Sequence, residues 1–139
     1  MNQAGAATVY SHGQCIHSGY STQMSEIDDL LPLPPATFHI LLALADDDRH
    51  GYAIIQDVEV RTKGELKLSP GTLYRSIQRM LEQGLLVETR ERPAPELDDE
   101  RRRYYRITAL GTAVAKAEAR RLSELVRMAR AAGFVPGRA

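Results

Sequence analysis

The sequence predicts a mainly α-helical fold that carries one small β-hairpin and ends in a long helix. The first observation is a helix with a clear start, apolar stripe and stop at residues 70–83. The second is a pair of short strand-like segments, residues 86–92 and 101–107, on either side of a loop that contains prolines. The third is a continuous helical pattern from residue 108 to residue 132. Helices interrupted by a single hairpin place the chain in the α+β class.

The composition suits one domain with an aliphatic core. The chain has 139 residues, of which 43% are hydrophobic, and it contains no Trp. It carries 18 Lys and Arg against 18 Asp and Glu, so it can bind a polyanion only through a local concentration of cations. Its one cysteine, Cys15, allows no internal disulfide, and no stretch resembles a signal peptide or a membrane span. We therefore expect a cytoplasmic protein with no membrane partner.

Residues 1–23 are expected to form a disordered leader. They are rich in Gly, Ala, Ser and Gln, and they contain no Lys, Arg, Asp or Glu. His12, Cys15 and His17 offer metal-binding side chains, but no fourth ligand is evident and a flexible loop holds metal poorly. No metal or cofactor is therefore expected, and the folded domain is placed at residues 24–107.

Two short helices are expected to open the domain. Pro34 and Pro35 favour a helix start, since proline lacks the N–H group that has no partner there, and the first helix is placed at residues 36–45. After an acidic turn, the second helix is placed at residues 51–61. Apolar residues at helical spacing are expected to face the core: Phe38, Leu41, Leu42 and Ala45 in the first helix, and Tyr52, Ile55 and Val58, with Ile54 as a further candidate, in the second.

The third helix, residues 70–83, has the strongest signals. Ser69 is a suitable N-cap, Pro70 occupies the first helical position, and Gly84 follows the last turn. An apolar stripe is expected in the core, namely Leu73, Ile77, Met80 and Leu81. The opposite face is polar and starts with cationic residues, namely Thr72, Arg75, Gln78, Arg79 and Glu82, while Tyr74 lies on the flank.

The hairpin has a basic returning strand. It begins with Arg101, Arg102 and Arg103, and because side chains alternate along a strand, only some of them can face one side. The same alternation predicts that one ring of Tyr104 and Tyr105 is buried and the other exposed. The loop at residues 93–100 contains an acidic run, which could pair with these arginines.

The last helix is placed at residues 108–132, with Thr108 as its N-cap, and residues 133–139 are expected to be a flexible tail. Its length of roughly 36 Å is more than a domain this small can cover. Apolar residues lie broadly along one side, namely Leu110, Val114, Ala117, Leu122, Leu125 and Ala129. Because an uncovered apolar stripe usually marks a partner, we expect this helix to form a twofold homodimer.

Together these elements describe a winged helix-turn-helix, in which one helix can enter the major groove of DNA beside a hairpin that contacts the backbone. Arg can bind the edge of guanine and Gln that of adenine, and the start of a helix attracts phosphate. Double-stranded DNA is the expected partner, contacted by Ser69, Thr72, Tyr74, Arg75, Gln78 and Arg79, by His50 and Lys67, and by Arg101, Arg102 and Arg103. Two plainer interpretations stay open: an ordinary solvated helix face, and a local structural role for His50.

An enzyme is not expected. The chain lacks Gly-x-Ser-x-Gly, Gly-x-Gly-x-x-Gly and Gly-x-x-x-x-Gly-Lys motifs. Cys15 lies in the leader, away from any base that could activate it. His39 lies in an apolar helix and suits packing better than catalysis. No catalytic residue is therefore assigned.

Several motifs occur together in the order typical of one family. They are the segment at residues 33–44, His50-Gly51-Tyr52, Leu68-Ser69-Pro70-Gly71-Thr72-Leu73-Tyr74, Glu82-Gln83-Gly84-Leu85-Leu86, and the strand at residues 101–107 with Thr108 and Gly111 after it. Over about residues 30–132 the chain resembles the PadR-family transcriptional regulators.

The resemblance implies a bacterial, cytoplasmic winged-helix homodimer, in most cases a repressor. The helix at residues 70–83 would enter the major groove, the hairpin at 86–107 would be the wing, and the single helix at 108–132, as in the short branch of the family, would join the subunits. Twofold symmetry implies an inverted-repeat operator. Some members lose DNA affinity on binding a small aromatic or hydrophobic compound, so such an effector is expected, with no site assigned.

The alternative is a winged-helix module that binds other proteins and not DNA. The zero formal charge and the acidic run in the loop at residues 93–100 favour it.

Overall fold

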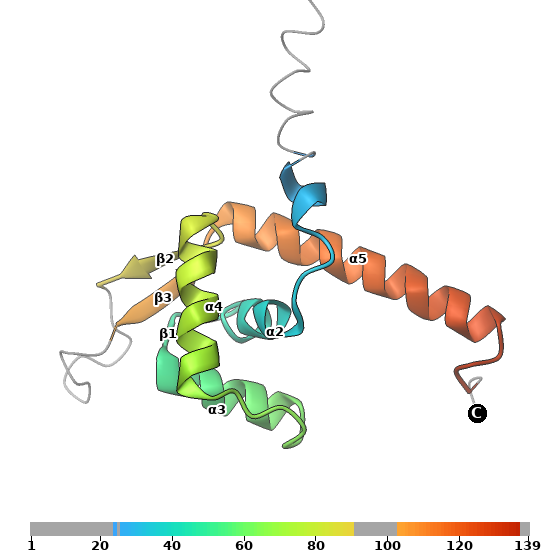
Figure 1. The fold of residues 1–139 in the computed structure, drawn as a ribbon, viewed down its shortest axis with the longest axis horizontal. Helices are drawn as coiled ribbons and strands as arrows, with labels where there is room; N and C mark the ends of the chain where they lie inside the picture. Colours follow the sequence, from blue (N-terminus) through green and yellow to red (C-terminus); the bar gives the residue numbers. More distant parts are fainter. Residues whose placement is uncertain (1–23, 25, 91–102, 137–139) are drawn as a thin grey trace, which may run out of the picture. The chain divides into compact units, whose positions relative to one another are not determined.

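Figure 1 shows the fold of the chain in a computed structural model. The structure describes residues 24, 26–90 and 103–136. The chain divides into two compact units, residues 1–31 and residues 32–139, and residues 26–30 of the first unit are helical. The described part of the second unit has the order helix, strand, helix, helix, strand, strand, helix. This is the mainly α-helical arrangement with one hairpin that the sequence predicts.

Helix α2 (Pro35–Ala43) has proline at its first position, as expected. The buried side chains at and just after this helix are Thr37, Ile40, Leu41, Ala43 and Leu44. Leu41 is therefore confirmed as a core residue, whereas Phe38 and Leu42 are only half-buried and Ala45 is exposed. The expected core face is partly wrong because α2 packs against three other helices, so its buried arc is wider than a single apolar stripe.

Helix α3 (Gly51–Arg61) has its buried line along Gly51, Ile54 and Val58. Tyr52 is 59% exposed, so the expectation that its ring faces the core is wrong. Gly51 takes the inward position of the first turn, since a Cβ added there would lie 2.2 Å from the hydroxyl oxygen of Tyr74. The Tyr74 ring thus lies directly against Gly51, and the next side chain, Tyr52, is exposed to solvent.

Helix α4 (Pro70–Glu82) confirms the prediction. The Ser69 Oγ accepts a hydrogen bond from the Thr72 N–H at 3.1 Å, and Gly84 adopts the left-handed conformation with φ of 80°. The buried stripe is Leu73, Ile77 and Met80. Leu81, the fourth expected member, is half-buried.

The strands of the described residues form one antiparallel sheet in the order β1 (Arg49–His50), β3 (Tyr104–Ile107), β2 (Leu86–Thr89). The hairpin of β2 and β3 is confirmed, but Arg90 and Arg103 lie outside the strands, which are therefore shorter than predicted. The sequence does not predict β1, because two residues after an acidic turn show no strand pattern.

Both tyrosines of β3 are buried, so the expected alternation of one inner and one outer ring is wrong. Tyr104 is 8% exposed and Tyr105 is 4% exposed. Because β3 is the central strand, His50 of β1 lies opposite Tyr104, and the two rings meet edge to face with centroids 5.3 Å apart. Tyr105 faces a groove beside α4. Neighbouring elements therefore cover both rings.

Helix α5 (Ala109–Ala131) has the predicted cap, because the Thr108 Oγ1 accepts the Gly111 N–H at 2.9 Å and donates to the Gly84 carbonyl at 2.6 Å. Its first turns pack closely on the domain: a Cβ added to Gly111 would lie 2.2 Å from the Leu85 carbonyl oxygen. Figure 1 shows its C-terminal half extending beyond α2, α3 and α4. Most side chains in that half are exposed.

Glu118 places a buried carboxylate in the middle of α5, with 2% of the residue exposed. The carboxylate accepts hydrogen bonds from the Arg121 Nε and Nη2 atoms at 2.7 and 2.9 Å, and from the Leu33 N–H at 3.3 Å. The Arg121 hydrogen bond is the main reason why the pKa of Glu118 lies below its ordinary value. This contact ties the segment before α2 to α5.

Glu118→Gln is expected to lower the free energy of unfolding near neutral pH by about 2 kcal/mol, since it removes the buried charge of a partly exposed ion pair. A lowered folded-state pKa means that the stabilising contribution is complete above the ordinary carboxyl pKa of 4.5 and is lost as pH falls through the folded pKa. In urea unfolding at several pH values, the wild-type advantage should therefore shrink below about pH 4.5. An advantage that stays constant down to about pH 3 would contradict this role.

Candidate nucleic-acid interface

The exposed face of α4 carries the polar side chains that the sequence predicts there. Arg75, Gln78, Arg79 and Glu82 are exposed, and Thr72 is half-buried. The Arg75 Nη2 lies 3.5 Å from the Thr72 Oγ1, and the Gln78 Nε2 donates to the Glu82 carboxylate at 3.3 Å. The two arginines therefore project from the second and third turns of α4, and an acidic residue follows only at the end of the helix.

The start of α4 adds hydroxyl groups to this face. The Ser69 Oγ caps the helix and lies 3.1 Å from the Thr72 Oγ1. The N-terminal end of a helix also carries partial positive charge, which favours phosphate. Lys67 lies two residues before the cap, with its Nζ 3.9 Å from the Glu59 carboxylate and 70% of its side chain exposed. An exposed pair of this length holds the lysine only weakly.

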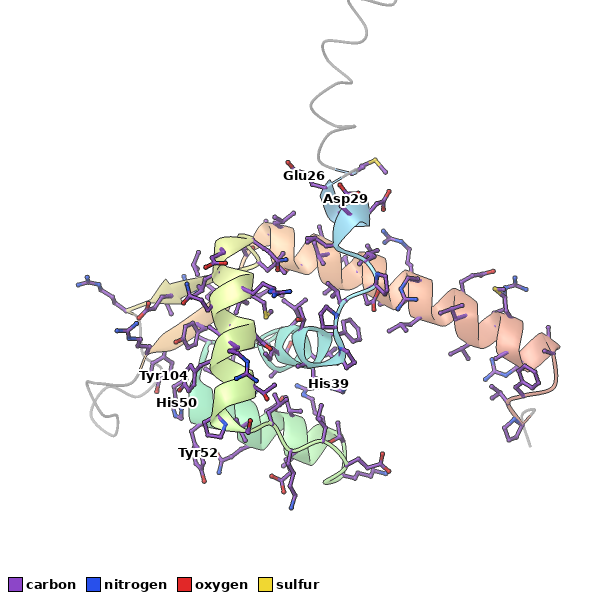
Figure 2. All side chains as sticks on the ribbon, viewed as in Figure 1. Glu26, Asp29, His39, His50, Tyr52 and Tyr104 are labelled. Carbon is purple, nitrogen blue, oxygen red and sulfur yellow. The ribbon has the colours of Figure 1, made fainter. Side chains whose placement is uncertain are left out.

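His50 and Tyr74, both predicted to contact DNA, have structural roles in the described fold. The His50 Nδ1 accepts the Ala53 N–H at 3.1 Å and so caps α3. Figure 2 shows the His50 side chain close to Tyr104 at the start of α3. Tyr74 packs its hydroxyl end against Gly51 and remains 49% exposed. His50 therefore has the local structural role that the sequence leaves open, and its contact with DNA stays a prediction.

Two basic residues of the described part of the hairpin, Arg103 and Arg106, are paired with acids. Arg103 lies 3.6 Å from the Glu88 carboxylate of β2. Arg106 makes hydrogen bonds of 2.8 to 3.2 Å to Asp48 in the turn before β1. Arg101 and Arg102, also predicted to contact DNA, lie outside the described residues. Of the three arginines assigned to the wing, the structure thus describes only Arg103.

A groove of about 660 Å³ lies between α4 and the sheet. Its lining includes Tyr52, Tyr74, Tyr105, Glu88 and Arg103. Burial, followed by the nearby Glu88 carboxylate and the Tyr74 ring, raises the pKa of Tyr105. Figure 2 shows Tyr52 projecting outward at the start of α3. Sequence reasoning misses this groove because its lining comes from elements that are far apart in the chain.

The residues assigned to a dimer contact differ in how much of each is exposed to a partner. Val114 is fully buried in the core of its own chain, so it cannot belong to a partner surface. Leu110, Ala117, Leu122 and Ala129 are half-buried and Leu125 is 46% exposed. Further large apolar side chains that the sequence assignment omits are exposed at the same end of the chain, namely Val126, Met128 and Phe134.

The part of the chain that the structure describes has no cluster of three or more His, Cys, Asp or Glu side chains that could hold a metal ion. His12, Cys15 and His17 lie outside that part. Within the same limits, no helix is long and apolar enough to cross a membrane.

Comparisons with known proteins agree with this geometry. The sequence model of the "Transcriptional regulator PadR-like family" matches residues 40–117. The transcriptional regulator Rv3488 of Mycobacterium tuberculosis is 36% identical to the chain over 89 residues, which cover 64% of this chain and 77% of that protein.

Two solved structures share the fold. A transcriptional regulator from Clostridium thermocellum has a TM-score of 0.60 and 24% sequence identity, covering 73% of this chain and 90% of that one. A PadR family transcription regulator from Clostridium difficile has a TM-score of 0.58 and 23% identity, covering 70% of this chain and 96% of that one. The family model spans the described helices and strands from within α2 to the first half of α5. The chain therefore belongs to the PadR-like family of transcriptional regulators.

Proposed function

We propose that this regulator binds double-stranded DNA in a sequence-specific way, as a cytoplasmic homodimer that represses transcription from an inverted-repeat operator. The observation that carries the proposal is the exposed face of α4, where Arg75, Gln78 and Arg79 project beside the hairpin of β2 and β3. A helix of this kind fits the major groove, where Arg and Gln side chains can distinguish guanine and adenine by their edges.

The remaining contacts divide into two kinds. Ser69, Thr72 and Lys67 lie around the start of α4 and suit phosphate oxygens, which fix the position of a protein on DNA without reading sequence. Arg103 directly precedes β3, at the loop end of the hairpin, and suits the backbone as well, as would Arg101 and Arg102 beyond the described residues. Base discrimination is therefore assigned to α4, and general affinity to the helix start and the hairpin.

A homodimer is supported by apolar surface that the described residues of the chain leave exposed. Leu122, Leu125 and Ala129 follow the i, i+3, i+7 spacing of one helix side, and Leu125 is 46% exposed. An apolar groove of about 260 Å³ also lies between α2 and the first half of α5, lined in part by Phe38 and Leu42. Two copies related by a twofold axis would bury such surfaces and present two α4 helices to successive major grooves.

Leu125→Glu is expected to shift the protein from dimer to monomer, because it places a charge in the middle of the proposed contact. Analytical ultracentrifugation should show a dissociation constant at least roughly 100-fold higher than in wild type. Ser123→Glu is the matched control, since Ser123 is exposed and lies off the line of Leu122, Leu125 and Ala129. A Leu125→Glu protein that remains as dimeric as the control would refute this interface.

Repression requires only that the bound dimer cover promoter DNA, and release by a small aromatic or hydrophobic effector would restore transcription. The direct test is selection of bound fragments from genomic DNA, followed by mobility shifts of the selected fragments at low and moderate salt. A tight, sequence-dependent shift and an inverted repeat in the selected fragments are expected. Salt should weaken the complex, because binding releases counterions from the DNA phosphates and added salt opposes that release.

The alternative is a winged-helix module that binds another protein. The pairing of Arg103 with Glu88 and of Arg106 with Asp48 favours it, because paired arginines have less charge to offer phosphate. Failure to shift any selected fragment at low salt, together with a stable complex with another protein, would establish this alternative over DNA binding.

A further inference from the structure

The groove between α4 and the sheet brings together three tyrosines and a carboxylate from different elements. Tyr52 comes from α3, Tyr74 from α4, Tyr105 from β3 and Glu88 from β2. The volume of about 660 Å³ is in the range of small-molecule sites. Ile77 and Leu81 of α4 add aliphatic surface to the lining.

Two of the three rings pack against other parts of the chain. The hydroxyl end of Tyr74 lies against Gly51, where even a single added carbon would be 2.2 Å from its oxygen. Tyr105 is 4% exposed, and its neighbours Glu88 and Tyr74, after burial, raise its pKa. A buried Tyr105 ring with a carboxylate nearby reduces the ordering that a ligand would have to impose.

The chemistry of this lining suits a positive charge. The faces of tyrosine rings attract ammonium groups, and several rings together form the cages that recognise quaternary ammonium ligands. Glu88 supplies a carboxylate at the same groove. Its present partner, Arg103, lies 3.6 Å away with 71% of its side chain exposed, and an exposed pair of this kind is easily exchanged for another cation.

We propose that this groove binds a small organic cation, a substituted or quaternary ammonium group whose charge lies between the rings of Tyr52, Tyr74 and Tyr105 and the carboxylate of Glu88. The aliphatic side chains of Ile77 and Leu81 then contact the apolar part of the ligand. Tyr74, Gln78 and Arg103 also line the groove and belong to the surface assigned to DNA. The ligand and DNA therefore exclude one another, a consequence that rests on the proposed function.

The binding test uses the full chain without DNA. The probe is choline, and its uncharged carbon isostere, 3,3-dimethylbutan-1-ol, is the matched ligand. The N-methyl proton resonance of choline should move upfield on binding, because the methyl groups lie over aromatic faces. Calorimetry should show the isostere binding roughly tenfold more weakly.

Two variants test the residues. Glu88→Gln keeps the shape of the side chain and should weaken choline binding roughly tenfold without changing binding of the isostere. Tyr52→Leu, at a 59% exposed position, should reduce the upfield shift and weaken binding roughly threefold. Glu65→Gln, which changes an exposed acid outside the groove, should leave choline binding unchanged.

The ligand class is wrong if the isostere binds as tightly as choline, if Glu88→Gln has no effect, or if benzoate binds and choline does not. Competition is measured separately, by adding choline to a preformed complex with a selected DNA fragment. Release of DNA from wild type but not from Glu88→Gln supports exclusion. Choline bound together with DNA refutes exclusion. Absence of any DNA complex refutes the proposed function, but the choline binding measured without DNA still tests the ligand class.

Discussion

Arg75→Ala and Arg79→Ala are each expected to reduce the preference for operator DNA over unrelated DNA by roughly tenfold to 100-fold. Both side chains are exposed on α4, and Arg79 has no ion pair with any other residue in the described part of the chain. Loss of a two-point contact to a base edge costs about 1 to 3 kcal/mol of discrimination. Fluorescence anisotropy with a selected operator and a scrambled duplex would measure this ratio.

The same measurement separates base reading from general attraction to phosphate. Lys67→Ala should weaken both duplexes alike and reduce the salt dependence, because a phosphate contact carries no sequence information. Arg120→Ala is the control, since Arg120 is an exposed arginine on α5 and lies away from α4. If Arg75→Ala and Arg79→Ala behave like Arg120→Ala, the reading face has been assigned to the wrong side of α4.

Gly111→Ala is expected to destabilise the fold by roughly 2 to 4 kcal/mol. The added Cβ would lie 2.2 Å from the Leu85 carbonyl oxygen and 2.9 Å from a side-chain carbon of Ile107. The carbonyl cannot move freely, because it accepts a hydrogen bond from the Thr108 N–H at 3.0 Å. The first turn of α5 must therefore shift, and the thermal midpoint should fall by roughly 10 °C or more at fixed protein concentration.

Gly71→Ala provides a matched control in the first turn of another helix. A Cβ added at Gly71 would meet only the Arg75 Nη1, at an ordinary distance of 3.5 Å. Alanine also restricts the unfolded chain more than glycine does, so this variant should be as stable as wild type or slightly more stable. Equal midpoints for the Gly111→Ala and Gly71→Ala proteins would show that the approach of α5 to Leu85 is not a constraint.

Local signals in the sequence predict most of the helices and the hairpin. Ser69 and Thr108 cap α4 and α5 as expected, and Gly84 ends α4 in the left-handed conformation. These features depend on residues only a few positions apart, so the chain specifies them locally. The polar face of α4 follows from the same periodicity, which is why Arg75, Gln78 and Arg79 are exposed as predicted.

Other features depend on contacts between distant segments. Tyr52 points outward because α3 buries the line of Gly51, Ile54 and Val58, and Tyr74 of another helix lies against Gly51. Tyr104 and Tyr105 are both buried because β1 pairs with β3 and α4 borders the other side. No pattern within either segment signals these contacts, so periodicity alone assigns the wrong exposure.

The sequence by itself determined the order and type of every described element of the second unit except β1. It also determined the polar face of α4 and, through its motifs, the family of the protein, because caps, turns, motifs and periodicity are local properties. Only the tertiary structure decided that Val114 belongs to the core, that His50 caps α3, and that Tyr52, Tyr74, Tyr105 and Glu88 line one groove. Burial and proximity arise when helices and strands pack on one another. They therefore depend on partners that no short stretch of sequence contains.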